Sequence, residues 1–194
     1  MDTYLTIASP AEGVYTEKRS KFSALAYPVR TVDEVKALID ACQKKYYDAR
    51  HVCYAYMLGP ERTQFRANDN GEPSGTAGKP ILGQINSRQL TDVLIVVVRY
   101  FGGIKLGTGG LTVAYKTAAS EALSMAEIVE RIVCDQFTIR FPYARTNDVM
   151  RALSACGAEV VGRDYDTACL LTLRIRRSLA EELKNKLGKI GEIV

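Results

Sequence analysis

The sequence predicts an α+β fold that is divided between two domains, residues 1–130 and 131–194. At 194 residues the chain is longer than the usual single domain of roughly 100 to 150 residues. The apolar run Val93–Val98 predicts a central strand covered on both faces. From about Val129 a new pattern of strands and helices begins, in the order β-α-β-β-α. With the tail 192–194 as a further strand, this order is typical of a ferredoxin-like α/β sandwich.

In the first domain, hydrophobic periodicity and capping residues locate the elements. Thr31 followed by Glu34 forms a capping box that predicts the start of a helix. Pro80 suits the first turn of another helix, because proline lacks the N–H group that a helix leaves unused there. The expected elements are strands 23–29, 51–58, 64–67 and 93–98, and helices 32–46, 80–88 and 111–125.

In the second domain, the same signals predict a strand over 132–141 and a helix over 146–156 that stops at Gly157. A hairpin is expected next, turning at Asp164-Tyr165-Asp166 between strands 158–163 and 168–176. Ser178 with Glu181 predicts the cap of a last helix, which ends near Gly188.

Composition excludes several classes of protein. The five cysteines include no C-x-x-C pair and there is one histidine, so neither a disulfide framework, a zinc ribbon nor a zincin is expected. The net charge of +4 is too small to require a nucleic-acid partner by itself. No run of about 20 apolar residues and no signal peptide is present, which predicts a cytoplasmic protein without a membrane partner.

Two glycine-rich segments carry the clearest functional pattern. The first glycine loop, residues 68–79, and the second glycine loop, residues 102–110, each lead into a helix, and each offers a lysine, Lys79 or Lys105. Free N–H groups at a helix N-terminus favour an anion, so a phosphate-like ligand is expected here. Neither loop matches a Walker or dinucleotide motif, and no cofactor is expected. The alternative is that these glycines only form tight turns.

Several side chains near the loops are candidates for chemistry. Asp69, Asn70 and Glu72 could bind a cation or act as acid and base, or could simply form turns. His51 could act as a base or be a histidine satisfied by hydrogen bonds, and nothing in the sequence orients it toward Cys53 as a nucleophile pair. Arg99 ends the central strand beside Tyr100, where α/β sites commonly open.

The block from Asp69 to Pro80, DNGEPSGTAGKP, together with the block from Val97 to Leu111, VVRYFGGIKLGTGGL, resembles the YigZ/IMPACT family in its bacterial two-domain form. Ala49-Arg50-His51 and the segment from Lys18 to Phe22 also match. A common version of the first block has two consecutive aspartates, whereas position 70 here is asparagine. A two-carboxylate metal site is therefore not expected.

The resemblance implies an N-terminal domain similar to the second domain of a small-subunit ribosomal protein, and a C-terminal ferredoxin-like domain similar to one in elongation factor G. Eukaryotic relatives regulate translation without known catalysis, by competing for the ribosome-associated activator of an amino-acid-starvation kinase. The resemblance therefore implies RNA, the ribosome or a protein of the translation machinery as a partner. The activator itself is not implied, because the eukaryotic relatives bind partners through an additional N-terminal domain for which no counterpart is expected here.

The leading hypothesis is a non-catalytic, translation-linked binding protein whose two glycine loops form one anion-binding surface. The alternative is an enzyme acting on a phosphorylated or carboxylated metabolite, with His51 or Glu72 as base and Arg99 and Lys105 holding the anion. The expected ligand-binding residues are Arg50, His51, Asp69, Asn70, Glu72, Gly75, Thr76, Gly78, Lys79, Arg99, Tyr100, Gly102, Gly103, Lys105, Gly107, Thr108, Gly109 and Gly110.

Overall fold

The structure, a computed structural model, describes residues 2–165 and 168–194. It mixes helices with antiparallel sheets, which confirms the predicted α+β class. The chain forms two compact units: one is Tyr4–Arg131, and the other is Ile132–Val194 together with the residues that precede Tyr4. Whether residues 1–130 fold alone stays a prediction.

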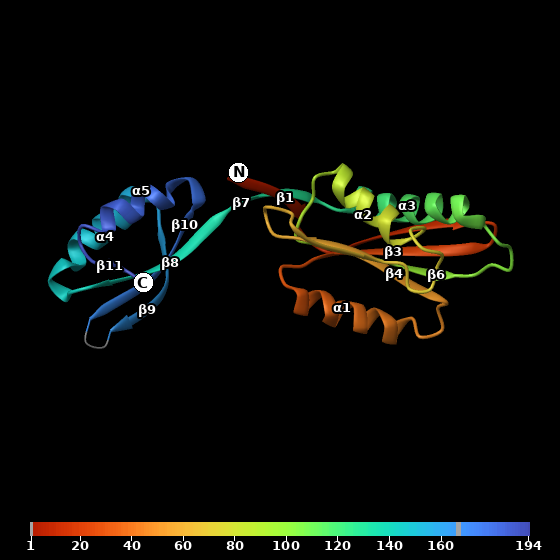
Figure 1. The fold of residues 1–194 in the computed structure, drawn as a ribbon, viewed down its shortest axis with the longest axis horizontal. Helices are drawn as coiled ribbons and strands as arrows, with labels where there is room; N and C mark the ends of the chain where they lie inside the picture. Colours follow the sequence, from red (N-terminus) through yellow and green to blue (C-terminus); the bar gives the residue numbers. More distant parts are fainter. Residues whose placement is uncertain (1, 166–167) are drawn as a thin grey trace. The chain divides into compact units, whose positions relative to one another are not determined.

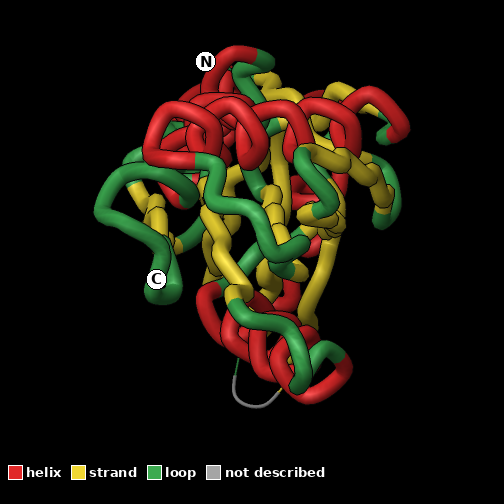
Figure 2. The backbone as a smooth tube through the Cα atoms, turned by 90° about the vertical axis from the view of Figure 1, so that its right-hand side faces the viewer, coloured by secondary structure: helices red, strands yellow, loops and turns green. Residues whose placement is uncertain are grey.

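The N-terminal unit is built on a five-stranded antiparallel sheet in the order β2-β3-β6-β4-β5. Helix α1 (Val32–Lys45) covers one face, and α2 (Gly78–Ser87) and α3 (Gly107–Met125) cover the other (Figure 1). The view of Figure 2 looks onto this unit and shows its strands between the two helical layers. The strands are β2 (Ala11–Glu17), β3 (Ser20–Pro28), β4 (His51–Leu58), β5 (Gln64–Asn68) and β6 (Val93–Tyr100).

Strand β6 lies at the centre of this sheet, and its residues from Val93 to Val98 are fully buried, as the apolar run predicts. Alternate side chains divide between two cores, because successive residues of a strand point to opposite faces. Val93, Ile95 and Val97 pack with α2 and α3, whereas the residues between them pack with α1. Arg99 continues the first set and so emerges on the α2/α3 face.

The predicted helix over 32–46 is confirmed as α1, where the Thr31 hydroxyl accepts the Glu34 N–H at 3.2 Å. Strand β3 begins three residues earlier than predicted, because Lys18 and Arg19 form a tight turn with positive φ angles of 46° and 65°. Helix α2 likewise begins at Gly78 and not at Pro80. Only glycine fits at that first position, since a Cβ there would lie 2.5 Å from the backbone nitrogen of Asn68.

The C-terminal unit has the predicted β-α-β-β-α-β order, with the sheet order β11-β8-β10-β9. Its two long helices lie on the same side of that sheet (Figure 1). The elements are β8 (Cys134–Phe141), a 3-10 turn (Tyr143–Arg145), α4 (Thr146–Cys156), β9 (Glu159–Tyr165), β10 (Cys169–Arg176), α5 (Arg177–Leu187) and β11 (Glu192–Ile193).

Three predictions in this part of the chain need correction or qualification. The strand expected over 132–141 is interrupted, because β7 (Ile128–Ile132) pairs with β1 (Thr3–Ile7) before β8 begins. The Ser178 cap is wrong: α5 starts at Arg177, and the Ser178 N–H is donated to the Asp2 carboxylate at 3.1 Å. Asp166 of the predicted turn lies outside the described residues. Within the part that the structure describes, no helix is both long and apolar enough to cross a membrane.

Candidate functional site

The candidate site lies at the end of the N-terminal sheet where β6 ends and where β3 and β4 begin. Strand register sets three side chains in one row across these strands, because Arg99 is paired with Phe22 on one side and with His51 on the other. The row lies on the face covered by α2 and α3, since Phe22 belongs to that core. An aromatic ring, a guanidinium group and an imidazole are thereby brought side by side.

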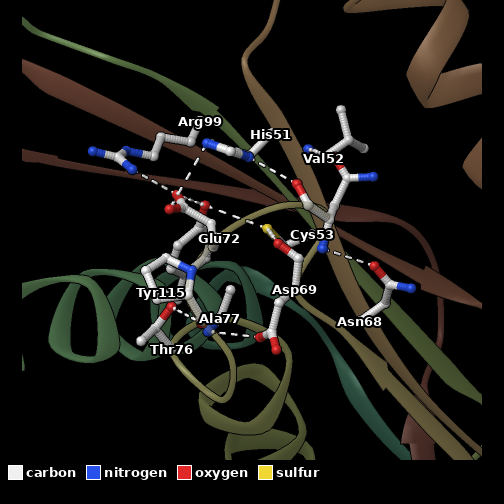
Figure 3. A network of polar contacts seen from close by, with 12 residues as sticks. His51, Val52, Cys53, Asn68, Asp69, Glu72, Thr76, Ala77, Arg99 and Tyr115 are labelled. Carbon is white, nitrogen blue, oxygen red and sulfur yellow. Dashed lines mark hydrogen bonds and ion pairs between the residues drawn. The ribbon is translucent and has the colours of Figure 1, made fainter. Parts of the chain in front are cut away.

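The first glycine loop delivers Glu72 to this row (Figure 3). Arg99 Nη1 donates to Glu72 Oε1 at 2.6 Å, and the Tyr115 hydroxyl donates to the same oxygen at 2.7 Å. His51 Nε2 lies 3.8 Å from the other carboxylate oxygen, Oε2. The Glu72 and Arg99 side chains are only 3% and 7% exposed. The site is therefore a buried ion pair with a hydroxyl donor and an imidazole beside it.

The Arg99 guanidinium is held between two aromatic rings, with Cζ 5.5 Å from the centroid of Phe22 and 5.6 Å from that of Phe101. Such contacts are attractive because the ring faces carry negative charge. Its Nε is buried, and no hydrogen-bond partner for that atom is found in the described part of the chain. Arg99 thus keeps one donor beyond those that the ion pair uses.

Cys53 is not a nucleophile in this arrangement. Its thiol lies 3.0 Å from the Asp69 carbonyl oxygen and 3.4 Å from the Tyr115 hydroxyl. Burial raises the pKa of Cys53 to about 12, so the thiol stays protonated at neutral pH. Burial likewise raises the pKa of Tyr115, which keeps its hydroxyl available as the donor to Glu72.

The imidazole of His51 is oriented by the chain itself, which the sequence did not reveal. Its Nδ1 lies 2.7 Å from the carbonyl oxygen of Asn70. Because a carbonyl oxygen only accepts, Nδ1 carries the hydrogen, and Nε2 is directed toward Glu72. The Asn70 side chain fixes this geometry, since its Oδ1 accepts the Val52 N–H at 3.0 Å.

Asp69 caps helix α2 from outside the helix. Its carboxylate accepts the N–H groups of Gly75 at 2.8 Å, Ala77 at 3.1 Å and Gly78 at 2.8 Å. Burial alone would raise the pKa of Asp69, but these three hydrogen bonds, helped by Lys79, lower it below its ordinary value. An external anion at Gly75 and Gly78 would therefore have to displace this internal carboxylate. Thr76 is also used internally, since its hydroxyl donates to the Pro73 carbonyl.

The second glycine loop is built differently. Gly102 packs against the Lys18-Arg19 turn so closely that a Cβ would lie 2.1 Å from the Arg19 carbonyl carbon, and its N–H is donated to Ser20 Oγ at 3.1 Å. Helix α3 then begins at Gly107, earlier than predicted, and among residues 2–165 and 168–194 no side chain caps it. The three residues 107–109 are exposed, as is Lys105.

The structure brings together His51, Asp69, Asn70, Glu72 and Arg99 from the predicted set. Tyr100 points elsewhere, and its hydroxyl donates to Asp48 at 2.8 Å. The remaining predicted residues lie on the exposed rim or within the loops: Arg50, Gly75, Thr76, Gly78, Lys79, Gly102, Gly103, Lys105, Gly107, Thr108, Gly109 and Gly110.

Sequence reasoning missed two members of the cluster. Tyr115 falls within the helix predicted over 111–125 but has no role in the prediction, and Phe22 was noted only within a matching block. The spacing of four residues from Leu111 to Tyr115 signals burial but not the hydroxyl's partner. Over the described ranges 2–165 and 168–194, no group of three or more His, Cys, Asp or Glu side chains is placed to hold a metal ion.

Comparison with known proteins agrees with the predicted resemblance. The family model described as the Impact N-terminal domain matches residues 18–123. The chain is 32% identical over 190 residues to IMPACT family member YigZ of Escherichia coli, covering 97% of this chain and 93% of that protein. It is 41% identical over 131 residues to IMPACT family member YvyE of Bacillus subtilis, covering 68% of this chain and 60% of that protein.

A solved structure supports the same conclusion across the whole chain. A crystal structure described only as that of a hypothetical protein superposes with a TM-score of 0.79 at 30% identity, covering 100% of this chain and 97% of the other. The matched domain contains every residue of the buried cluster, from Phe22 to Tyr115. On this evidence the chain belongs to the IMPACT family.

Proposed function

We propose that this protein is a non-catalytic binding protein linked to translation, and that it contacts RNA or the ribosome through a basic surface around the second glycine loop. The link to translation comes from the family. The observation that carries the contact surface is the N-terminus of α3, which is exposed, rich in glycine and without a side-chain cap from the part of the chain that the structure describes. Free N–H groups at such a terminus suit a phosphate oxygen.

Basic residues lie on the two glycine loops and on the turn and strands at this end of the sheet. We define the basic rim as six exposed side chains, Lys18, Arg19, Lys21, Arg50, Lys79 and Lys105. In the described part of the chain, none of the six forms an ion pair. Phe101, 41% exposed, lies next to the loop and could stack on a base. A rim of this kind supports binding to a phosphate backbone more than recognition of one base sequence.

The buried cluster supports a structural role for the groups that could otherwise do chemistry. Glu72 is held by Arg99 and Tyr115 and is almost fully buried, so it is poorly placed to take a proton from a substrate. Cys53 remains a thiol. Both features favour a binding protein over an enzyme.

The face of the C-terminal sheet opposite its helices does not support a second RNA surface of the stacking type. The exposed, stacked rings of Tyr143 and Tyr165 do not belong to that face, since Tyr165 is paired with Cys169 of the core. The aromatic residues on β8, Phe137 and Phe141, pack with the helices. The opposite face carries polar side chains, such as Thr138, whose hydroxyl lies 3.2 Å from that of Thr172. Stacking on a sheet needs exposed aromatic rings on that face. We therefore assign the contact to the N-terminal unit.

A salt titration tests the proposal. Binding of a labelled single-stranded RNA should weaken with salt by roughly 0.7 log units per log unit for each phosphate neutralised, so three contacts give a slope near −2. Lys105→Ala should flatten the slope by about 0.7. The matched control is Lys189→Ala, which removes an exposed lysine from the C-terminal unit and should leave the slope unchanged. Absence of RNA and ribosome binding at low salt would refute the proposal.

An enzyme acting on a phosphorylated or carboxylated metabolite is the second candidate, and one observation favours it. Arg99 Nε is buried without a partner in the described residues, and His51 Nε2 lies nearby with its side chain 13% exposed. Arg99 Nε could donate a hydrogen bond to an anion that enters beside Glu72, and His51 Nε2 could accept one from a hydroxyl group of the same molecule. Saturable binding of a small phosphorylated compound that is lost in His51→Gln, without any RNA binding, would favour this candidate.

A further inference from the structure

A second site lies at the opposite end of the N-terminal sheet. There a cavity of about 370 Å³ is lined by Tyr4, Thr6, Pro28, Val29, Arg30, Glu34, Asp92 and Arg131. None of these belongs to the site described above, because β6 begins beside Asp92 and ends eight residues later at Tyr100. A strand of that length spans roughly 26 Å.

The acidic groups of this cavity are already engaged by the chain. Asp92 Oδ1 accepts the Gly59 N–H at 2.9 Å, and Glu34 Oε2 accepts the Arg30 backbone N–H at 2.6 Å. The Asp92 carbonyl accepts the Val29 N–H at 2.9 Å. Asp92 is held there with a positive φ of 55°, a conformation that costs a non-glycine residue energy. Backbone groups from several segments thus hold Asp92 and Glu34 in place.

The two arginines of the cavity differ from these carboxylates in their partners. Arg30 and Arg131 both line the cavity, and in the described residues neither guanidinium has an ion-pair partner within 4.0 Å. Both arginines act on the Tyr4 hydroxyl: burial and Asp92 raise its pKa, whereas Arg131 and Arg30 oppose that shift. Arg30 and Arg131 thus line one cavity together with the apolar side chains of Pro28 and Val29.

We propose that this cavity binds a small organic molecule through an oxyanion group, carboxylate or phosphate, held between Arg30 and Arg131. A guanidinium group matches both oxyanions, because its N–H donors form a planar fork. The cavity volume lies within the range of small-ligand sites, about 300 to 1,000 Å³. Pro28 and Val29 contact the apolar part of the ligand. This site does not rest on the function proposed for the glycine loops.

The experiment uses the full chain and follows the arginine Nε–Hε signals by NMR, at constant ionic strength, with inorganic phosphate in one arm and citrate in the other. We expect the Arg30 and Arg131 signals to shift saturably in at least one arm, with a midpoint on the order of 1 mM. The arm that saturates identifies the oxyanion. Equal, non-saturating shifts of all exposed arginines in both arms would overturn the proposal.

One variant in the cavity and two control variants test whether the anion binds in the cavity. Arg131→Gln should weaken binding about tenfold, because one charge-assisted contact is lost. Arg66→Gln, which removes an exposed arginine from β5, should not change the midpoint. Lys105→Ala should also leave it unchanged, which separates this site from the glycine loops. If Lys105→Ala abolishes the shifts while Arg131→Gln does not, the cavity is not the site.

Discussion

The two glycine loops share a sequence pattern but differ in which groups accept hydrogen bonds from the N–H groups at the start of the helix that follows each loop. Both are rich in glycine, both contain a lysine, and both lead into a helix of the same layer. In the first loop the Asp69 carboxylate accepts three backbone N–H groups around the start of α2. In the second loop no side chain of the described residues caps α3, and residues 107–109 are exposed.

One acidic residue accounts for this difference. Asp69 stands six residues before Gly75 and nine before Gly78, so the loop can fold back onto its own second residue. The segment from Arg99 to Gly110 contains no aspartate or glutamate. The first helix end therefore carries its own anion, and the second remains able to receive one from outside. A glycine-rich turn indicates an anion site only when the chain does not supply the anion.

The buried ion pair that joins the first glycine loop to strand β6 should give the largest effect. Glu72→Ala leaves Arg99 buried without its partner, which we expect to lower the free energy of unfolding by about 3 to 5 kcal/mol. Urea unfolding followed by circular dichroism measures this loss. An effect below about 1 kcal/mol would mean that the pair is open to water.

A double variant tests whether Glu72 and Arg99 stabilise the fold as a pair. Glu72→Met combined with Arg99→Met removes both charges and keeps apolar volume, so it should cost less than Glu72→Ala alone. A double variant that is as unstable as the sum of the single changes would indicate that the two residues do not act as a pair.

Removing the internal anion of the first loop should have the next largest effect. Asp69→Ala leaves three backbone donors without an acceptor, which we expect to cost about 2 to 3 kcal/mol. The control is Thr108→Ala, since Thr108 is exposed in the first turn of α3 and its side chain makes no hydrogen bond within the described residues. That change should stay within about 0.5 kcal/mol.

The Asp69 contribution should also depend on pH. The folded state lowers the pKa of this carboxyl, so its stabilisation is present above the unfolded pKa of about 3.9 and is lost as pH falls through the folded pKa. The stability of the wild type should therefore fall more steeply below pH 4 than that of Asp69→Asn. Parallel curves for the two proteins in acid would contradict the proposed cap.

The fold was largely predictable because periodicity and capping are local signals. Val93–Val98 as a covered central strand and Thr31 as a helix cap follow directly from residue types. The interruption at Val133 was not predictable. It depends on pairing between β7 and β1, whose sequences lie more than a hundred residues apart.

The candidate site was predictable only in part. The sequence indicated Glu72, Arg99 and His51 as candidates, but not that Arg99 and Tyr115 donate to one oxygen of Glu72. That convergence requires the cross-strand register and the position of α3, which are tertiary properties. The same limit applies to Asp69, because its residue type allows a turn, a metal ligand or a cap.

Alanine substitutions at two glycines near the starts of α2 and α3 should change the free energy of unfolding in opposite directions. Gly78→Ala places a Cβ 2.5 Å from the backbone of Asn68, which we expect to cost about 1 to 3 kcal/mol. At Gly109 a Cβ meets nothing within 4 Å, so Gly109→Ala should gain about 0.4 to 1 kcal/mol from reduced flexibility of the unfolded chain. Thermal unfolding of the two variants, compared with that of the wild type, measures both changes in stability. A loss at both positions would show that α3 also begins in close contact.

The smallest change in stability should come from adding a carboxylate at the start of α3, as Asp69 already provides at the start of α2. Thr108→Asp places a carboxylate in the first turn of α3, where it meets free N–H groups and the positive end of the helix dipole. We expect a gain of about 0.3 to 1 kcal/mol in the free energy of unfolding. If the basic rim binds phosphate at this helix end, the same carboxylate should repel the ligand and weaken RNA binding. Thr117→Asp changes the net charge equally but lies in the middle of α3, so it separates the local effect from the loss of overall charge. Equal weakening by both variants would place the RNA contact away from the helix end.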